Sequence, residues 1–259
     1  MPTALVTGAS SGIGLELAST AARDRHDLVL VARQRERLES IGRGLAEEYG
    51  VEVTILAKDL ADPAAPAAVA RELSERGIAV DVLVNDAGFG VYGFFAETPI
   101  DRELEMMQVN AAALTHLTKL FLAGMLERRR GWILNVASTA AFQPGPIMAV
   151  YYATKAYVLS FSEALASETA GTGVTVTALC PGPTHTEFER RAGFKPAPLF
   201  RSPLVKPAAD VARAGWEGMK RGKRLVIPGI ANRVLVQAER VTPRRLVTAI
   251  ARKLQESRQ

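Results

Sequence analysis

Three tyrosines surround one lysine in the segment "AVYYATKAYVL", residues 149–159. A nearby ammonium favours the phenolate and lowers the pKa of a tyrosine from about 10 toward the range of a general acid or base. On a helix Tyr151 lies about 40° and Tyr152 about 60° from Lys155, whereas Tyr157 lies about 200° away. The segment therefore predicts either a proton-transferring tyrosine and lysine or simple aromatic packing. Helical geometry alone leaves Tyr151 and Tyr152 open as the partner of Lys155.

A glycine-rich segment, "TGASSGIG", occupies residues 7–14. Glycines at positions 8, 12 and 14 allow a tight turn and a close approach of the backbone to a pyrophosphate. An apolar strand pattern precedes the segment and a helical pattern follows it, so the phosphate would lie at a helix N-terminus. Gly8, Gly12 and Gly14 thus predict a dinucleotide site, the alternative being a structural turn.

The segment "VARQRERL" (31–38) indicates which dinucleotide binds. Sites for NAD commonly place an acidic residue at the end of the second strand to bind the ribose 2′-hydroxyl, but Ala32 and Arg33 stand there. Arginine offers paired donors for a 2′-phosphate, with Ser10 or Ser11 and Arg37 as helpers. We therefore expect NADP, with NAD the less favoured cofactor. The alternative is that these arginines only solvate a helix start.

Two further loops end predicted strands at the same edge. Asp59 in "KDL" could accept a hydrogen bond from an adenine amino group or cap the following helix. The turn "NDAG" (85–88) is followed by Gly90 and Gly93, so this loop either approaches a ligand or is simply tight.

These residues need a scaffold that brings strand ends together, and the chain alternates short β-branched runs with helical patterns. Strands that are apolar nearly throughout predict a parallel sheet covered on both faces. We expect an α/β fold, one doubly wound parallel sheet of about seven strands with helices on both faces, a Rossmann fold. The expected strands are 3–7, 27–32, 51–57, 80–85, 132–138, 174–180 and 224–228, and the helices lie near 12–24, 34–49, 62–76, 99–127 and 152–170.

The composition fits one globular domain spanning residues 1–259. The chain is 48% apolar and 23% charged, and its single cysteine, Cys180, excludes an internal disulfide. We see no secretion signal at the N-terminus and no window suited to a membrane span. We therefore expect a soluble cytoplasmic protein with no metal site and no nucleic-acid partner.

Taken together, "TGASSGIG", "NDAG", Asn110 in "VNAAALT", Ser138, "YYATK" and "PGPTHT" resemble the short-chain dehydrogenase/reductase family over about residues 3–190. The family places a serine 13 residues before its catalytic tyrosine, which implies Tyr151 as acid/base and Ser138 as donor to the substrate oxygen. Lys155 would then hold the nicotinamide ribose and lower the pKa of Tyr151. Asn110 would organise a proton-relay water, which completes the catalytic set Asn110, Ser138, Tyr151 and Lys155.

The resemblance also implies the cofactor contacts. The Pro181–Gly182 turn would shape the nicotinamide pocket, and Thr184 and Thr186 would lie near the nicotinamide or its phosphate. Two positions depart from the family pattern: Asp86 replaces an asparagine and Thr184 an aliphatic residue. The predicted cofactor-binding set is Gly8, Ser10, Ser11, Gly12, Ile13, Gly14, Arg33, Asp59, Leu60, Asn85, Ala87, Gly88, Tyr151, Lys155, Pro181, Gly182, Thr184 and Thr186.

These assignments imply an NADPH-dependent oxidoreductase acting on a carbonyl or secondary alcohol, related to ketoacyl and hydroxysteroid reductases. Residues 187–207 are predicted to form a substrate lid, in which Phe188, Phe194, Leu199 and Phe200 cover a substrate or pack on the domain. With "GFGVYGFF" (88–95), they favour an apolar acyl- or steroid-like substrate. The alternatives are an NAD-dependent alcohol dehydrogenase and a non-catalytic protein that senses NADP.

The C-terminal part of the chain is basic, although the whole chain carries a net charge of only +5. Residues 190–259 contain 17 Lys and Arg against 4 Asp and Glu. Residues 232–254 predict two amphipathic helices that break near Pro243, within a basic extension over 230–259. The extension could support a subunit interface, bind an acidic carrier, contact a membrane surface or cover the domain's own core. Family members commonly pair through the helices near 99–127 and 152–170, so we expect a homodimer or homotetramer.

Overall fold

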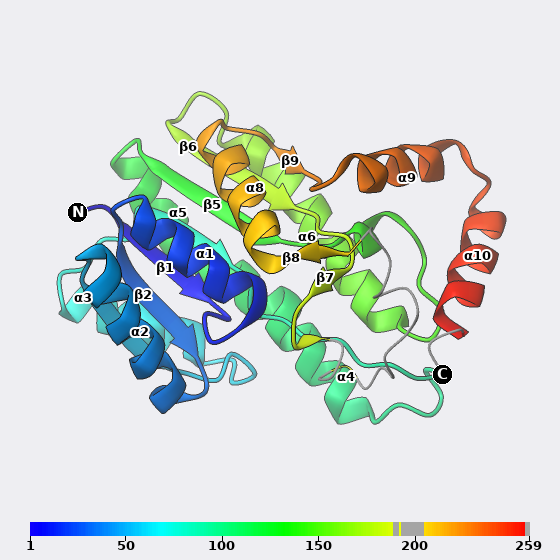
Figure 1. The fold of residues 1–259 in the computed structure, drawn as a ribbon, viewed down its shortest axis with the longest axis horizontal. Coiled ribbons are helices and arrows are strands. Elements are labelled where there is room, and N and C mark those ends of the chain that lie inside the picture. The colour runs from blue at the N-terminus through cyan, green and yellow to red at the C-terminus, as the bar shows by residue number, and fades with distance from the viewer. Residues whose placement is uncertain (189–191, 193–204, 257–259) are drawn as a thin grey trace.

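The computed structural model describes residues 1–188, 192 and 205–256, and its centre is a seven-stranded sheet (Figure 1). The strands run in the order β3-β2-β1-β4-β5-β6-β9, and each neighbouring pair is parallel. The doubly wound sheet expected from the sequence is thereby confirmed. Its strands are β1 (Thr3–Thr7), β2 (Asp27–Ala32), β3 (Val53–Ala57), β4 (Val82–Asn85), β5 (Gly131–Val136), β6 (Val174–Leu179) and β9 (Leu225–Val226). Two short strands, β7 (Thr184–His185) and β8 (Lys206–Pro207), pair separately.

Helices cover both faces of the sheet because successive strand residues point to opposite sides. Ala4 and Val6 pack in a cluster with residues of α1 (Gly12–Arg23), α2 (Arg35–Tyr49) and α8 (Ala208–Lys220). Leu5 between them packs in a second cluster with α3 (Ala65–Glu75), α5 (Leu114–Glu127) and α6 (Ala149–Glu168). The near-continuous apolar strands therefore follow from burial on both sides.

One core helix, α8, was not expected from the sequence. The segment "AADVARAGWEGMK" contains Gly215 and Gly218, which lower helix propensity. The structure gives both glycines a packing role, because a Cβ on Gly215 would lie 2.6 Å from Leu179 and one on Gly218 would lie 2.3 Å from Val226. Close contact with β6 and β9 thus outweighs intrinsic propensity here.

A long helical run joins α4 (Ile100–Met107), the π-helix η1 (Gln108–Ala113) and α5. An 18-residue window in Ile100–Glu127 has a mean hydropathy of 1.3, so this helix could cross a membrane by length and composition, and the expectation that no window qualifies is wrong on this measure. In the fold 39% of that window is buried. Leu114, Leu117 and Met125 are buried, so the run serves as a core helix.

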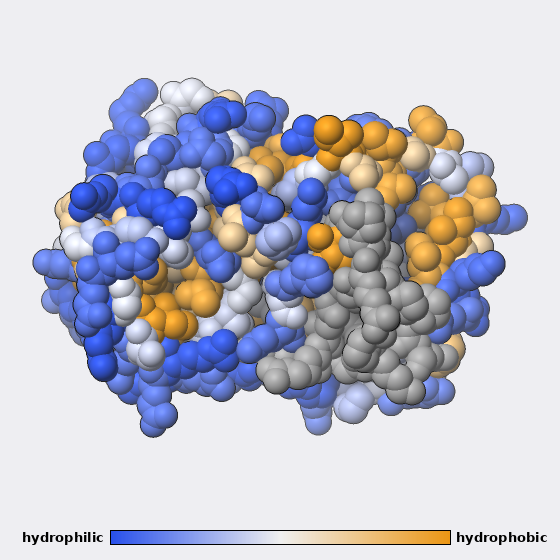
Figure 2. Space-filling view, viewed as in Figure 1, coloured by the Kyte–Doolittle hydropathy of each residue, from blue (hydrophilic) through white to orange (hydrophobic). Residues whose placement is uncertain are grey.

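The C-terminal arm, which comprises α9 (Ile230–Val241) and α10 (Arg244–Glu256), extends beyond the layered body (Figure 1). The break between the helices falls at Thr242–Pro243, as the sequence predicts. Apolar side chains of the arm gather on the face shown in Figure 2. Those that remain exposed are Ile230, Val234, Leu235, Val241, Leu246, Ile250 and Leu254.

Candidate functional site

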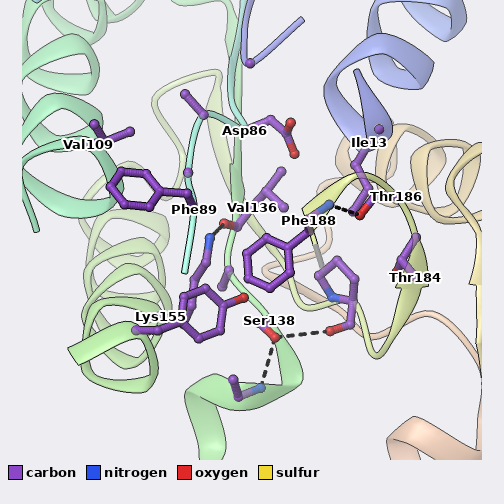
Figure 3. A pocket seen from close by; sticks show the side chains of 18 of the residues that line it. Ile13, Asp86, Phe89, Val109, Val136, Ser138, Lys155, Thr184, Thr186 and Phe188 are labelled. Atoms are coloured by element: carbon purple, nitrogen blue, oxygen red, sulfur yellow. Dashed lines mark hydrogen bonds between the residues drawn. The ribbon is translucent and has the colours of Figure 1, made fainter. Parts of the chain in front are cut away.

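The lysine of the opening segment is buried beneath the carboxyl end of the sheet. Helix α6 begins at Ala149, and Lys155, 7% exposed, donates a hydrogen bond of 2.8 Å from Nζ to the carbonyl of Val136 at the end of β5 (Figure 3). Its Nζ lies 5.9 Å from the centroid of the Tyr151 ring. Burial lowers the pKa of Lys155 to about 8, and the nearby Asp86 opposes this change. The ammonium is thus fixed beside Tyr151.

Ser138 follows β5 and begins the short 3-10 helix η2 (Thr139–Phe142). Its Oγ accepts a hydrogen bond from the amide of Ala140 at 3.1 Å and donates to the Pro181 carbonyl at 3.5 Å. Figure 3 shows Ser138 and Lys155 at the same end of the cavity. The expected fifth strand ran to Ser138, but β5 ends at Val136, because the residues beyond it turn into η2.

Asn110 lies inside the π-helix η1, 1% exposed. Its Oδ1 accepts from the amide of Phe89 at 3.0 Å, and its Nδ2 donates to the Phe89 carbonyl at 2.9 Å and to Thr154 Oγ1 at 3.2 Å. Single π-helical turns are frequent at functional sites. Asn110 therefore ties the loop after β4 to helix α6, next to Lys155.

The glycine-rich segment forms a tight turn between β1 and α1. Gly8 and Gly12 have φ angles of 70° and 58°, which favour glycine. Gly14 has no room for a side chain, because a Cβ there would lie 2.5 Å from the Gly8 carbonyl. Ser11 is the N-cap of α1, yet its side chain makes no capping hydrogen bond. The amides of Gly12 and Ile13 at this helix start can bind a phosphate.

Asp86 places a carboxyl beside this turn. Its Oδ2 would lie 2.6 Å from a Cβ on Gly14, and the Gly14 backbone donates a hydrogen bond to it. Burial raises the pKa of Asp86 to about 7, although Lys155 and the Gly14 hydrogen bond favour the charged form. The carboxyl is enclosed by protein on most sides but keeps partial access through the cavity. Thr7 Oγ1 fixes the loop by accepting from the Asp86 and Ala87 amides at 3.0 Å each.

The opposite end of the site lies at the ends of β2 and β3. Arg33 is exposed there and lines the cavity. Arg37, proposed as its helper, instead forms an ion pair with Glu187 at 3.4 Å. Asp59 accepts a hydrogen bond from the Ala61 amide at 3.1 Å, so it stabilises the turn before α3 while also lining the cavity.

One cavity of about 760 Å³ connects these groups. The predicted residues that line it are Gly8, Ser10, Ser11, Gly12, Ile13, Arg33, Asp59, Leu60, Ala87, Gly88, Ser138, Tyr151, Lys155, Pro181, Gly182, Thr184 and Thr186. Gly14, Asn85 and Asn110 do not line it. Asn85 is buried and donates from Nδ2 to Asn135 Oδ1 at 2.9 Å and to Thr118 Oγ1 at 3.1 Å, so its side chain supports the sheet.

The other tyrosines of the opening segment have separate surroundings. Tyr152 accepts a hydrogen bond of 2.7 Å from Gln255 of α10 and also lines the cavity. Tyr157 is 43% exposed and stacks on Phe161 with ring centroids 5.8 Å apart. Tyr157 therefore packs on an outer surface, and Tyr152 connects helix α6 to the C-terminal arm.

Sequence reasoning did not find several lining residues. Asp86 was noted as a departure but not placed in the site. Lys58, Gln34 and Val109 stand inside the quoted segments, but no role was assigned to them. The arm residues Asn232, Leu235, Val236, Glu239, Ala251, Leu254 and Gln255 also line the cavity. Their amphipathic pattern was visible, but nothing in the sequence indicated that they fold back onto the site.

The predicted lid is described only in part. Phe188 lines the cavity (Figure 3). Its ring centroid lies 5.2 Å from that of Tyr151. Its amide donates to Thr186 Oγ1 at 3.2 Å. Phe194, Leu199 and Phe200 lie outside the described residues.

The comparisons with known proteins agree with this arrangement. The family model for short chain dehydrogenase matches residues 2–195. The chain is 33% identical over 229 residues to the very-long-chain 3-oxoacyl-CoA reductase of Anas platyrhynchos, covering 85% of this chain and 70% of that protein. It is 36% identical to hydroxysteroid dehydrogenase-like protein 1 of Gallus gallus over 69% of this chain, but it spans only 54% of that longer relative.

A solved structure gives a similar result. A short-chain dehydrogenase from Sphingobium yanoikuyae, in complex with NADPH, superposes with a TM-score of 0.83 at 35% sequence identity. The match covers 93% of this chain and 94% of that one.

Proposed function

The chain belongs to the short-chain dehydrogenase family, and we propose that it is an NADPH-dependent oxidoreductase that interconverts a ketone and a secondary alcohol. One observation carries the proposal: a single cavity joins a glycine-rich helix start and Arg33 at one end to Ser138, Tyr151 and Lys155 at the other. A phosphate-binding turn and the residues that would transfer a proton can therefore contact the same bound ligand. This is the arrangement that a nicotinamide-dependent reduction requires.

The residues fit a dinucleotide on structural grounds. Gly8 and Gly12 adopt φ angles that favour glycine, and the Ser11 side chain makes no capping hydrogen bond at the start of α1. The pyrophosphate would therefore meet the backbone amides of Gly12 and Ile13 and the Ser11 hydroxyl. Pro181, Gly182, Thr184 and Thr186 would line the nicotinamide end.

Bound NADPH supplies the hydride, and the protein's own groups handle the oxygen of the substrate. Tyr151 donates the proton to the carbonyl oxygen, while the Ser138 hydroxyl donates a hydrogen bond to the same atom and holds it in place. The buried ammonium of Lys155, fixed by the Val136 carbonyl, favours the phenolate that remains on Tyr151. Asn110 keeps the loop after β4 in position through its two hydrogen bonds to Phe89.

Arg33 supports NADP over NAD. No acid stands at the end of β2, and the exposed guanidinium can bind a 2′-phosphate with paired hydrogen bonds. The Sphingobium yanoikuyae neighbour binds NADPH. Comparing the affinities of NADPH and NADH for wild-type protein and Arg33→Ala tests this point: the variant should lose affinity for NADPH selectively, by about tenfold or more. Equal losses for both cofactors would contradict the assignment.

The substrate half of the cavity supports an apolar carbonyl compound. Phe89, Val109, Met148 and Phe188 line it together with Leu235 and Leu254 of the arm. The named relatives include an oxoacyl-CoA reductase and a hydroxysteroid dehydrogenase-like protein. We therefore assign an acyl- or steroid-like ketone as the substrate class.

A screen of acyl, steroid, quinone and sugar carbonyls for NADPH consumption tests the function as a whole. Turnover of apolar ketones, absent with sugars, supports the assignment. The absence of turnover with every carbonyl, together with tight NADP binding, would favour the non-catalytic alternative. Faster turnover with NADH would favour the NAD-dependent alternative.

Three further features belong to the same proposal. The catalytic domain spans residues 1–259, with the arm as an extension.

The exposed side chains of Leu120 and Leu126 on α5 and of Tyr157 on α6 support a homodimer or homotetramer. Light scattering would measure the oligomeric state. A cytoplasmic location rests on the single cysteine, and imaging of the tagged chain would test it.

The outer face of the arm offers a second role. Exposed apolar residues of α9 and α10 alternate with Arg233, Arg240, Arg244, Arg245 and Arg252, a pattern that suits an anionic membrane surface. Co-sedimentation with anionic and neutral vesicles at low and high salt tests this contact. Absence of binding under every condition would contradict the membrane contact, and the arm would then serve only as a wall of the cavity.

A further inference from the structure

The C-terminal arm forms one wall of the proposed substrate cavity. Asn232 fixes the start of α9, because its Nδ2 donates to the Pro228 carbonyl at 2.8 Å. The same side chain packs on the Pro181–Gly182 turn, where a Cβ on Gly182 would lie 2.5 Å from Nδ2. Helix α9 therefore starts at the predicted nicotinamide end and extends away from it.

Helix α10 is held against helix α6. Gln255 is 2% exposed and donates from Nε2 to the Tyr152 hydroxyl at 2.7 Å. The Tyr92 hydroxyl donates to the Gln255 carbonyl at 2.7 Å. Because Tyr152 neighbours Tyr151, the arm has a fixed position relative to the reacting groups.

Glu239 contributes a carboxyl to this wall. It lines the cavity on α9, one turn after Leu235 and Val236. Its Oε2 is buried and has no hydrogen-bond partner in the described part of the chain. A buried acceptor without a partner is unfavourable, because it has lost its hydrogen bonds to water. Burial accordingly raises the pKa of Glu239.

Three other charged side chains that line the cavity, Arg102, Glu105 and Glu187, are already engaged. Arg102 forms an ion pair with Glu105, and the cavity-lining Glu187 forms one with Arg37. Glu239 has no such ion pair within the described residues. The Glu239 carboxyl thus has unused capacity to accept hydrogen bonds, which a rotation of its side chain would bring to a molecule in the cavity that it lines.

The position of Glu239 along α9 indicates how long that molecule must be. Glu239 lies seven positions after Asn232, which corresponds to about two helical turns or roughly 10 Å. Leu235 and Val236 lie between them. A substrate that reaches from the nicotinamide end to Glu239 therefore crosses an apolar stretch first.

We propose that Glu239 is a specificity-determining residue, which binds a hydrogen-bond donor, a hydroxyl or an ammonium, at the end of an apolar ketone remote from its carbonyl. The proposal rests on the proposed function and narrows its substrate class. The carboxylate accepts the donor of the correct substrate, and it repels a ketone that carries a carboxylate at the same place. The Glu239 carboxyl, which lacks a partner among the described residues, gains one when the correct substrate binds. A ketone without a donor at this place leaves the carboxyl unpaired and is therefore the poorer substrate.

The test uses linear methyl ketones of increasing chain length together with their ω-hydroxy, ω-amino and ω-carboxy derivatives. With the wild-type protein and NADPH, kcat/KM for the ω-hydroxy or ω-amino ketone should exceed that for the unsubstituted ketone by about tenfold at the best chain length. The ω-carboxy ketone should be poorer by about tenfold. The hydroxy and amino series separate the two kinds of donor.

Variants of Glu239 distinguish the effect of its charge on substrate preference from the effect of its size and shape. Glu239→Gln keeps an acceptor oxygen, so it should retain part of the ω-hydroxy preference but accept the ω-carboxy ketone. Glu239→Leu should lose the donor preference and turn over the unsubstituted ketone at least as well as the wild type. The controls are Gln237→Leu on the exposed side of α9 and Glu256→Gln on α10, which should leave every ratio unchanged.

Calorimetry keeps the test independent of turnover. The same ketones are titrated into the Tyr151→Phe protein loaded with NADPH, and their ranking should match that of kcat/KM. The proposal is overturned if the wild type and Glu239→Leu rank the derivatives alike. If no ketone consumes NADPH, the proposed function fails, whereas the calorimetric ranking still decides the role of Glu239.

Discussion

Replacing Asp86 with asparagine should stabilise the folded protein, and increasingly so as the pH rises. Burial raises the pKa of this carboxyl from 3.8 to about 7. Between these values the folded state binds more protons than the unfolded state, so stability falls with rising pH. The side-chain amide introduced by Asp86→Asn carries no charge and can still accept the Gly14 hydrogen bond, so this loss disappears.

The size of the effect follows from the same values. A pKa raised from 3.8 to about 7 would cost at most about 4 kcal/mol above both values. Partial solvent access reduces this cost, and we expect about 1–2 kcal/mol at neutral pH. Lys155, with its pKa lowered to about 8, keeps most of its charge at lower pH and does not reverse the trend there.

Urea unfolding, followed by fluorescence of Trp132 and Trp216, measures this prediction. The free energy of unfolding of Asp86→Asn should equal that of the wild type near pH 3, below both pKa values, and exceed it by about 1–2 kcal/mol near pH 7.5. Glu47→Gln, an exposed change of the same kind on α2, controls for the loss of a negative charge. A variant that is less stable than the wild type across the range would refute the argument that burial dominates at Asp86.

Two other perturbations have defined outcomes. Gly14→Ala would place a Cβ 2.5 Å from the Gly8 carbonyl and 2.6 Å from Asp86 Oδ2, so thermal melting should show a loss of about 1–3 kcal/mol and weaker stabilisation by NADP. Gly44→Ala on α2, where a Cβ meets nothing within 4 Å, should be neutral or stabilising, and equal melting of the two variants would contradict the packing argument. Cys180 is buried, which raises its pKa to about 12, so iodoacetamide should label it only after unfolding. Mass spectrometry measures the label, and full labelling of the native protein would show that the thiol is accessible.

The sheet could be predicted from the sequence because a local pattern of residues marks each of its strands. Strands buried on both faces, such as "DLVLVA" over 27–32, show as continuous apolar runs, and the glycine-rich turn marks where the first strand ends. The strand limits differ by a few residues, as at Ser138, since the transition into η2 depends on a contact with Pro181.

The arm and α8 could not be placed in the same way. Helix α8 contains two glycines that allow close packing on Leu179 and Val226, and both of these residues lie outside the helix. The arm shows an amphipathic pattern, but the pattern does not tell what its buried side meets. The hydrogen bond between Gln255 and Tyr152, 103 residues apart, is a tertiary contact that no local signal carries.

The roles of the site residues stay predictions. The spacing from Ser138 selects Tyr151 only through the family resemblance, since helical geometry allowed Tyr152 as well. The structure brings Ser138, Tyr151 and Lys155 to one cavity, but it also brings Tyr152 there. A functional comparison of the two tyrosines is therefore needed.

The most direct test of the account compares Tyr151→Phe with Tyr152→Phe in a single turnover of bound NADPH with an apolar ketone. Tyr151→Phe should slow hydride transfer by about 10²–10⁴-fold, the usual contribution of a general acid, while NADPH affinity stays within about twofold of the wild type. Tyr152→Phe should transfer hydride within about tenfold of the wild-type rate, because it removes the hydroxyl that contacts Gln255 and leaves Tyr151 in place. Full activity of Tyr151→Phe, or the larger loss in Tyr152→Phe, would contradict the assignment of Tyr151 as the proton donor.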